Sequence, residues 1–140
     1  MVILQLGPQA AEKSISLEAP EIDDTYVRAE PDLLQLVLRN LLTNAIKFSH
    51  PGGTVKVQLE KTGAHCLIKV IDNGVGIPVP QQQRLFTHQT HALSGTRQER
   101  GAGLGLFLCR EFMERQGGTI AFNSTEGQGS TFWISLPRSA

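Results

Sequence analysis

The 140-residue sequence predicts an α/β fold, in which a mixed β-sheet carries helices on one face. Two segments, 31–48 and 104–116, repeat apolar residues with the period of an amphipathic helix. Two others, 54–72 and 117–137, each read as a pair of strands joined by a short turn. Strand pairs of this kind are antiparallel, whereas strands interleaved with helices favour parallel neighbours, so the sheet is predicted to be mixed.

The amino-terminal third supplies two short strands and the first long helix. The stretches "SISLEAP" (14–20) and "TYVRAE" (25–30) are rich in strand-forming residues. Pro31 is suited to the first turn of a helix, and Asp32 follows it where the helix dipole favours an acid. The helix is expected to end near Phe48, because "SHPGG" follows it.

The rest of the chain alternates strands with two further helices. "TVKVQLEK" alternates from Thr54, and "AHCLIKVID" follows a turn around Gly63, so we expect an antiparallel pair. "PQQQRLF" (80–86) suggests a short helix, and the polar segment 87–103 shows no period. The helix "LGLFLCREFMERQ" comes next, and "GGTIAFNS" and "STFWISLP" form a last strand pair around "TEGQG".

Composition and charge exclude several classes of protein. Thirteen basic and thirteen acidic residues give zero formal charge, which argues against a nucleic-acid-binding surface or a polybasic membrane anchor. No apolar run of about 18 residues and no signal peptide occur. Cys66 and Cys109 lie in apolar segments and are expected to be buried thiols. We therefore expect a cytoplasmic domain, whether or not its parent chain is anchored in a membrane, which makes no nucleic-acid or membrane contacts of its own and is monomeric in isolation.

The first long helix carries an unusual polar stripe. On a helical wheel, Asn40, Asn44 and Lys47 share one edge of the apolar face, although asparagine is a mediocre helix former. Such a stripe is either a solvated helix edge or one wall of a polar pocket. Amide oxygens suit Mg²⁺, and a lysine nearby suits phosphate. The expected core face of this helix consists of Leu34, Val37, Leu38, Leu41, Ala45 and Phe48.

Two glycine-containing stretches allow a functional and a purely structural interpretation. "IDNGVGIP" is either a turn or a place where Asp72 accepts hydrogen bonds from an exocyclic amine and Gly76 permits close approach. "GAGLGL" is either a loop or an anion-binding helix start. The long polar segment before it has the character of a lid, with Arg97 and Arg100 available to phosphates.

Four motifs in this order, "NLLTNAIKF", "IDNGVGIP", "GAGLGL" and "EGQGSTFWISLP", resemble the ATP-binding (catalytic) domain of bacterial two-component sensor histidine kinases. The same superfamily contains gyrase, heat-shock chaperone and mismatch-repair ATPases. The resemblance implies a two-layer α/β sandwich of the Bergerat type, with about five strands under three helices. It also implies a single domain over 1–140, in which 1–13 are a residual connection from upstream dimerisation helices and 87–102 form the ATP lid.

The resemblance further implies that the site holds ATP and Mg²⁺. Asn44 would ligate the metal, and Asn40 and Lys47 would be the catalytic residues that reach the phosphates or the metal shell. Asp72 would accept a hydrogen bond from the adenine amine. The remaining expected nucleotide contacts are Phe48 and Ile77 lining the pocket, Gly74 and Gly76 beside the base, Gly101, Gly103 and Gly105 around the phosphates with Leu104 and Leu106 beside them, and Thr131 in the water network of Asp72.

The implied chemistry is phosphoryl transfer to a histidine. Hydrolysing relatives place a water-activating glutamate one helical turn before the metal-binding asparagine, and here that position is Asn40, which cannot act as a general base. None of the four histidines (His50, His65, His88, His91) stands in an acceptor motif, so the chain is expected to be a fragment of a longer kinase. The partners would be that kinase's dimerisation helices and a response-regulator receiver domain.

Two alternatives stay open at this point. One is a serine-protein kinase of the anti-sigma type, and the other is an ATP-binding regulatory module without transfer activity. The segment before the lid, "LFTHQTH", has only Phe86 where the family usually has two phenylalanines, so it departs from the family pattern.

Overall fold

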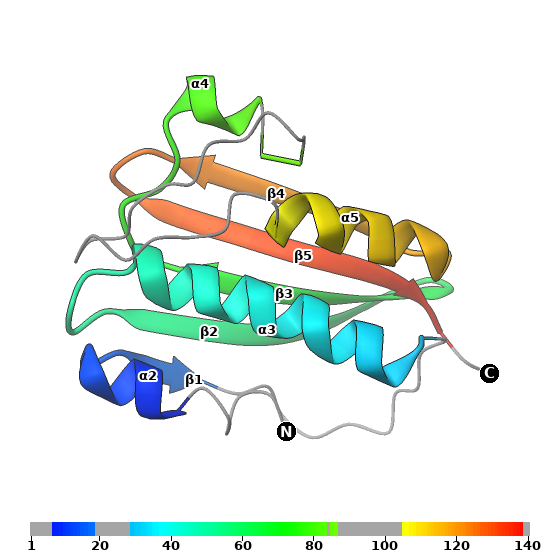
Figure 1. Ribbon diagram of the computed structural model, residues 1–140, viewed down its shortest axis with the longest axis horizontal. Helices are drawn as coiled ribbons and strands as arrows, with labels where there is room; N and C mark the ends of the chain where they lie inside the picture. The colour runs from blue at the N-terminus through cyan, green and yellow to red at the C-terminus, as the bar shows by residue number, and fades with distance from the viewer. Residues whose placement is uncertain (1–6, 19–28, 84, 87–104, 139–140) are drawn as a thin grey trace.

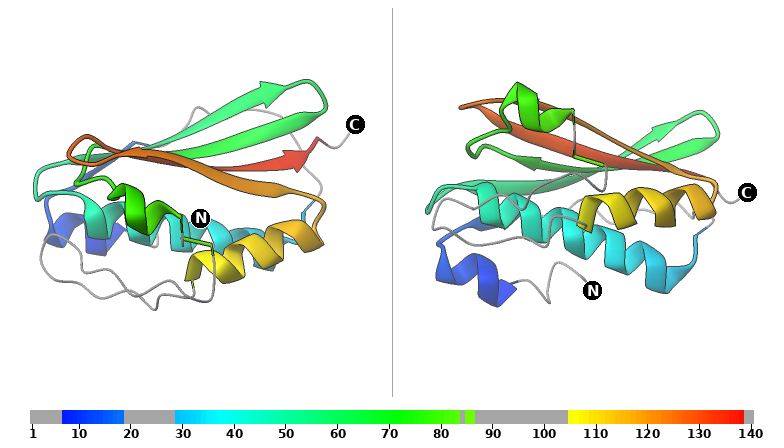
Figure 2. Two further views of the ribbon diagram at one scale, coloured as in Figure 1. Left: turned by 90° about the horizontal axis from the view of Figure 1, so that it is seen from above. Right: turned by 45° about the horizontal axis from the view of Figure 1, so that its top comes forward.

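The computed structural model describes residues 7–18, 29–83, 85–86 and 105–138, and these form two layers. One layer is a five-stranded sheet of order β1-β2-β3-β5-β4, and helices α3 and α5 lie side by side on one of its faces (Figures 1 and 2). The predicted α/β sandwich with a mixed five-stranded sheet is confirmed. The elements are α2 (Gly7–Glu12), β1 (Ser16–Glu18), α3 (Pro31–Phe48), β2 (Thr54–Thr62), β3 (His65–Asp72), α4 (Val79–Gln82), α5 (Gly105–Arg115), β4 (Thr119–Thr125) and β5 (Gly129–Pro137).

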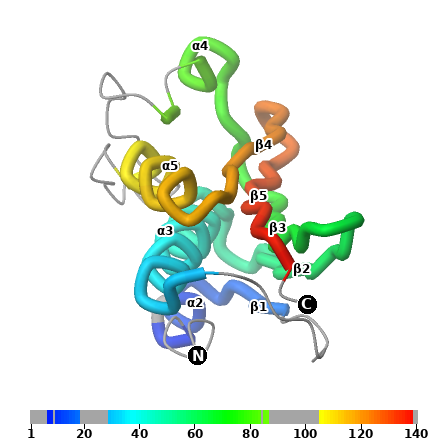
Figure 3. Tube along the Cα trace, turned by 90° about the vertical axis from the view of Figure 1, so that its right-hand side faces the viewer, coloured from blue at the N-terminus to red at the C-terminus, as the bar shows by residue number. Residues whose placement is uncertain are grey.

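The sheet is mixed because its first strand pairs differently from the others. Strand β1 is parallel to β2, whereas β2–β3, β3–β5 and β4–β5 are antiparallel. The register pairs Asp72 with Ser130 and Ile71 with Thr131. Since side chains alternate along a strand, Asp72 and Ser130 share the helix-covered face, while Ile71 and Thr131 share the opposite face. The view along the layers in Figure 3 shows α3 and α5 on one side of the strands.

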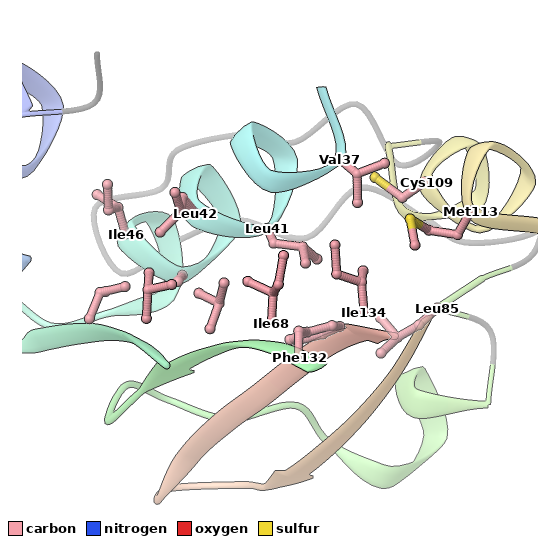
Figure 4. Packing of buried hydrophobic residues seen from close by; sticks show 14 of the residues in the cluster. Val37, Leu41, Leu42, Ile46, Ile68, Leu85, Cys109, Met113, Phe132 and Ile134 are labelled. Atoms are coloured by element: carbon pink, nitrogen blue, oxygen red, sulfur yellow. The ribbon is translucent and has the colours of Figure 1, made fainter. Parts of the chain in front are cut away.

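The core lies between the two helices and the sheet (Figure 4). Val37 and Leu41 of α3 and Met113 of α5 are at most 2% exposed, as is Ile134 of β5 below them. Burying one side chain of this size stabilises the fold by about 1.5–3 kcal/mol, so this layer contact holds α3 in place. Cys109, in the same cluster, is a free thiol whose pKa burial raises to about 12. Cys66 is also buried and forms no disulfide, which confirms the expectation of buried thiols for both cysteines.

The helices differ from expectation in three respects. Residues 7–12 form α2, which sequence periodicity did not identify because a helix of six residues is too short to show a period. The short helix expected at 80–86 spans Val79–Gln82 only. The buried face of α3 also includes Leu42 and Ile46, since α2 and β1 lie beside that end of the helix. Most of the expected strand 25–30 lies outside the described residues.

Among the described residues, no helix combines the length and the apolar character that crossing a membrane would need.

Candidate functional site

Helix α3 carries the predicted polar stripe, and Asn40 of this stripe faces the start of α5. Asn40 and Asn44 are half-buried, and Lys47 is 7% exposed. The amide nitrogen Nδ2 of Asn40 donates to the carbonyl oxygen of Leu36 at 3.0 Å. The free end of that amide, Oδ1, faces Gly105, where an added Cβ would lie 3.1 Å from it. Asn40 is therefore not on a simple solvated edge, because its acceptor oxygen faces a neighbouring element.

The carboxyl end of α3 also brings a cation beside an aromatic ring. The Nζ atom of Lys47 lies 4.8 Å from the centroid of the half-buried Phe48 ring, a cation–π distance. The two residues are the last of the helix, so their positions depend on how its final turn is held. Lys47 carries its charge in a nearly enclosed position, where a phosphate oxyanion would interact with it more strongly than in open water.

Asp72 ends β3 as a buried carboxylate. Its side chain is 7% exposed, and its Oδ1 accepts the backbone N–H of Gly74 at 2.9 Å. Burial raises the pKa of Asp72 above its ordinary value of 3.8, and hydrogen bonds from the backbone of Gly74 and Ser130 act in the opposite direction. A carboxylate held in this way is oriented by the backbone and can accept a further hydrogen bond from a ligand amine.

The loop after Asp72 is packed against the end of α3. The backbone N–H of Val75 donates to the carbonyl oxygen of Phe48 at 3.1 Å. A Cβ added to Gly74 would overlap that same carbonyl, and one added to Gly76 (φ +68°) would overlap the carbonyl of Thr125. These two glycines are thus required by contacts within the protein. Their predicted place beside the base stays a prediction.

This packing gives a sharp stability prediction. Gly74→Ala should lower the free energy of unfolding by about 1–3 kcal/mol or more, because the new methyl meets backbone and not a flexible side chain. Gly7→Ala is the matched control, since nothing lies within 4 Å of the Cβ that it would add. Urea unfolding of both variants checks the prediction. Equal stability of the two would mean that the loop is not packed on α3.

Residues that sequence reasoning missed hold the other end of this loop. The backbone N–H of Ile77 donates to the hydroxyl of Ser124 at 2.8 Å, and that hydroxyl lies 2.8 Å from the Ser130 hydroxyl. Gln82 donates from Nε2 to the carbonyl of Ile77 at 2.7 Å. Ile77 itself is buried, at 4% exposure. A lone serine and glutamine in polar stretches carry no spacing signal, so only the folded arrangement identifies them.

The expectation for Thr131 needs a correction. Strand alternation places its side chain on the sheet face opposite to Asp72, and the residue on the face of Asp72 is Ser130. Ser130 is 7% exposed and faces Ser124. Thr131 also lines a depression of about 270 Å³, which it shares with Ile71, Asn123 and Asp72 itself. Support for the surroundings of Asp72 therefore comes from Ser130, one residue earlier.

The phosphate side of the predicted site is only partly described. Gly105 is the first residue of α5 and faces Asn40, and Leu106 packs against the core. Gly101, Gly103 and Leu104 lie outside the described residues, as do the expected lid 87–102 and its arginines. The start of α5 thus lies beside the middle of α3, at Asn40, and the Asp72 loop lies beside its carboxyl end, at Phe48.

The donor set fits Mg²⁺ bound together with a nucleotide. Mg²⁺ usually keeps several waters and takes one or two protein ligands plus phosphate oxygens. Within the described residues, no group of three or more His, Cys, Asp or Glu side chains could form an all-protein metal cage. A half-buried amide such as Asn44 supplies one hard oxygen and adds no negative charge beside a triphosphate.

Comparison with known proteins identifies the family to which this chain is similar. Residues 29–140 match the family model described as histidine kinase-, DNA gyrase B- and HSP90-like ATPase. The alginate biosynthesis sensor protein KinB of Pseudomonas aeruginosa is 41% identical over 132 residues, which are 93% of this chain and 22% of KinB.

Solved structures agree with this match. The catalytic domain of histidine kinase ThkA superposes with a TM-score of 0.81 at 26% identity, over 97% of this chain and 87% of that one. Full-length ShkA in complex with AMPPNP gives a TM-score of 0.81 at 28% identity, over 99% of this chain and 29% of ShkA. The chain therefore spans less than a third of the length of KinB and of ShkA.

Proposed function

Since the chain belongs to the histidine kinase-, DNA gyrase B- and HSP90-like ATPase family, we propose that it binds ATP with Mg²⁺ and donates the γ-phosphoryl group to a histidine on the dimerisation helices of a sensor kinase. The similarity to KinB and to the ThkA catalytic domain supports the sensor-kinase branch of the family. The AMPPNP complex of ShkA supports a nucleoside triphosphate as the ligand. A response-regulator receiver domain would then take the phosphoryl group from the histidine.

The observation that carries this proposal is Asn40. It stands where hydrolysing relatives have the glutamate that activates water, and its amide is neutral. Its Nδ2 already donates to Leu36, and its Oδ1 faces the start of α5. The site therefore has an oriented amide where a hydrolase needs a base, which favours delivery of the phosphoryl group to a nucleophile that needs no base.

A neutral imidazole is such a nucleophile. Its nitrogen lone pair forms the P–N bond while the bond between the γ-phosphorus and the β–γ bridging oxygen breaks, ADP leaves, and the other ring nitrogen releases its proton to solvent. Lys47 would neutralise phosphate charge, and Asp72 would orient the adenine. Mg²⁺, held in part by Asn44, would supply further charge neutralisation. Catalysis would thus come mainly from positioning and electrostatics.

A transfer assay tests this function. With radiolabelled ATP and Mg²⁺, the chain alone should not become stably labelled, because none of its histidines has an acceptor context. Dimerisation helices of its own kinase, supplied as a separate polypeptide, should become labelled at histidine. The label should be acid-labile and base-stable, as a phosphoramidate is. The rate should be low, since separate polypeptides lose the effective concentration, of order millimolar, that a linker provides.

Three other outcomes would contradict the proposal. An acid-stable phosphoserine on a partner protein would indicate the anti-sigma type of kinase. Bound ATP without transfer to any dimerisation helix would indicate a regulatory module. Brisk hydrolysis of ATP by the chain alone would contradict the role given to Asn40.

A further inference from the structure

Lys13 is a buried lysine that the proposed site does not include. It is 3% exposed, and it lies outside residues 29–140, which the family model matches. Its Nζ donates to two backbone carbonyl oxygens at the end of α3, that of Ile46 at 3.1 Å and that of Lys47 at 2.8 Å. Ammonium groups are rarely buried, because their desolvation is costly unless hydrogen-bond acceptors compensate for it.

The backbone around Lys13 is fixed by the way α2 ends. Ser14 adopts the left-handed conformation (φ +56°), its N–H donates to Ala11 at 3.1 Å, and the N–H of Ile15 donates to Ala10 at 2.8 Å. This pair of bonds is a Schellman motif with Lys13 as the C-cap, and the buried side chains of Ala10 and Ile15 accompany it. Lys13 therefore extends from a rigid helix end, and its carbonyl also accepts the N–H of Gly52 at 3.1 Å.

The bonds from Lys13 complete the carboxyl terminus of α3. The last four carbonyls of a helix have no partner within it. Here Ala45 accepts from the Ser49 hydroxyl at 2.7 Å, and Phe48 accepts from the N–H of Val75. Lys13 donates to the two carbonyls between them, those of Ile46 and Lys47. Its positive charge lies at the negative end of the helix dipole.

We propose that Lys13 is a positioning residue for the nucleotide site: it holds the last turn of α3, and through that turn the Lys47–Phe48 pair and the loop that begins at Asp72. The proposal rests on the proposed function in that the site it supports is the ATP site. Without Lys13 the carbonyl oxygens of Ile46 and Lys47 both lose this donor, while the Ser49 N–H still donates to that of Ile46 at 3.2 Å. The last turn then loosens, and the bond from Val75 to Phe48 opens more often.

The test compares Lys13→Met, which keeps the length of the side chain and removes its charge and donors, with Ile134→Val in the core as a control of general stability. Two quantities are measured: the affinity for ATP with Mg²⁺ by calorimetry, and hydrogen exchange of the Val75 amide without nucleotide, relative to amides of β5. Lys13→Met should weaken ATP binding about tenfold, equivalent to about 1.4 kcal/mol, and should accelerate Val75 exchange selectively. Ile134→Val should do neither. Lys13→Arg, which keeps the charge and donors, should recover most of the affinity.

Each outcome decides the proposal. If Lys13→Met lowers the midpoint of unfolding but leaves ATP affinity and the relative exchange of Val75 unchanged, Lys13 is merely structural and the proposal is wrong. If Ile134→Val weakens ATP binding equally at equal loss of stability, the effect is not specific to α3, which also overturns it. If the unaltered chain binds no ATP, the proposed function fails, and Val75 exchange in the unliganded proteins still decides whether Lys13 positions the loop.

Discussion

The Asp72→Asn protein is expected to bind ATP about 10- to 100-fold more weakly than the unaltered chain while remaining folded. A hydrogen bond to a charged group contributes about 1.5–3 kcal/mol, and asparagine also turns a donor toward the adenine amine if its oxygen keeps the Gly74 N–H. Calorimetry at fixed Mg²⁺ measures the loss. Asp32→Asn is the matched control, because it removes the same charge from an exposed position in the first turn of α3.

Two results would contradict the assignment of Asp72 to adenine. One is unchanged ATP affinity in a folded Asp72→Asn protein. The other is an equal loss in Asp32→Asn, which would indicate a general electrostatic effect. A comparison of ATP with GTP adds a further check, since GTP lacks the exocyclic amine at that ring position. The unaltered chain should prefer ATP, and Asp72→Asn should lose most of that preference.

Asp72→Asn should also change how the free energy of unfolding depends on pH. Because burial raises the pKa of Asp72, the folded chain binds this proton more tightly than the unfolded chain. The contribution of Asp72 to the free energy of unfolding is therefore lost as the pH rises from 3.8, the ordinary pKa of aspartate, to the higher pKa of Asp72 in the folded chain. Asn at this position cannot ionise, so the variant should lack this part of the pH slope. A buried carboxylate that costs stability at neutral pH is consistent with a binding role.

The sheet and the long helices could be predicted from the sequence because their hydrophobic patterns extend over many residues. Helix α3 begins at Pro31 and ends at Phe48 as predicted, since proline, the apolar period and the "SHPGG" breaker agree with one another. Strands β2 and β3 alternate over eight or nine residues, so their pairing around Gly63 was predictable. Helix α2 was not, because six residues show no period and its stability comes from packing and from the Schellman motif at Ser14.

Site residues could be predicted where their type is unusual for the surrounding sequence. They could not be predicted where their role depends on contacts that form only in the folded structure. Two asparagines in a helix and an acid after an apolar strand stand out in a sequence. Which of Ser130 and Thr131 shares the face of Asp72 depends on strand register, and a shift of one residue exchanges the faces. Lys13 carries no signal at all, because its acceptors are backbone carbonyls more than thirty residues away.

Removal of Asn44 should separate metal binding from base recognition. Asn44→Ala deletes a hard oxygen ligand, and even changes to groups that support metal ligands typically cost about 10- to 100-fold in metal affinity. ATP affinity should therefore fall at least about tenfold with Mg²⁺ present and should change little when a chelator removes the metal.

The control for Asn44→Ala is Asn123→Ala, which removes an exposed asparagine from β4, on the sheet face away from the helices. This control should leave ATP affinity unchanged in both conditions. Equal losses for Asn44→Ala with and without Mg²⁺ would mean that the half-buried Asn44 supports the fold or contacts the nucleotide directly. The difference between the two titrations thus assigns the amide to the metal independently of any effect on Asp72, because adenine recognition needs no Mg²⁺.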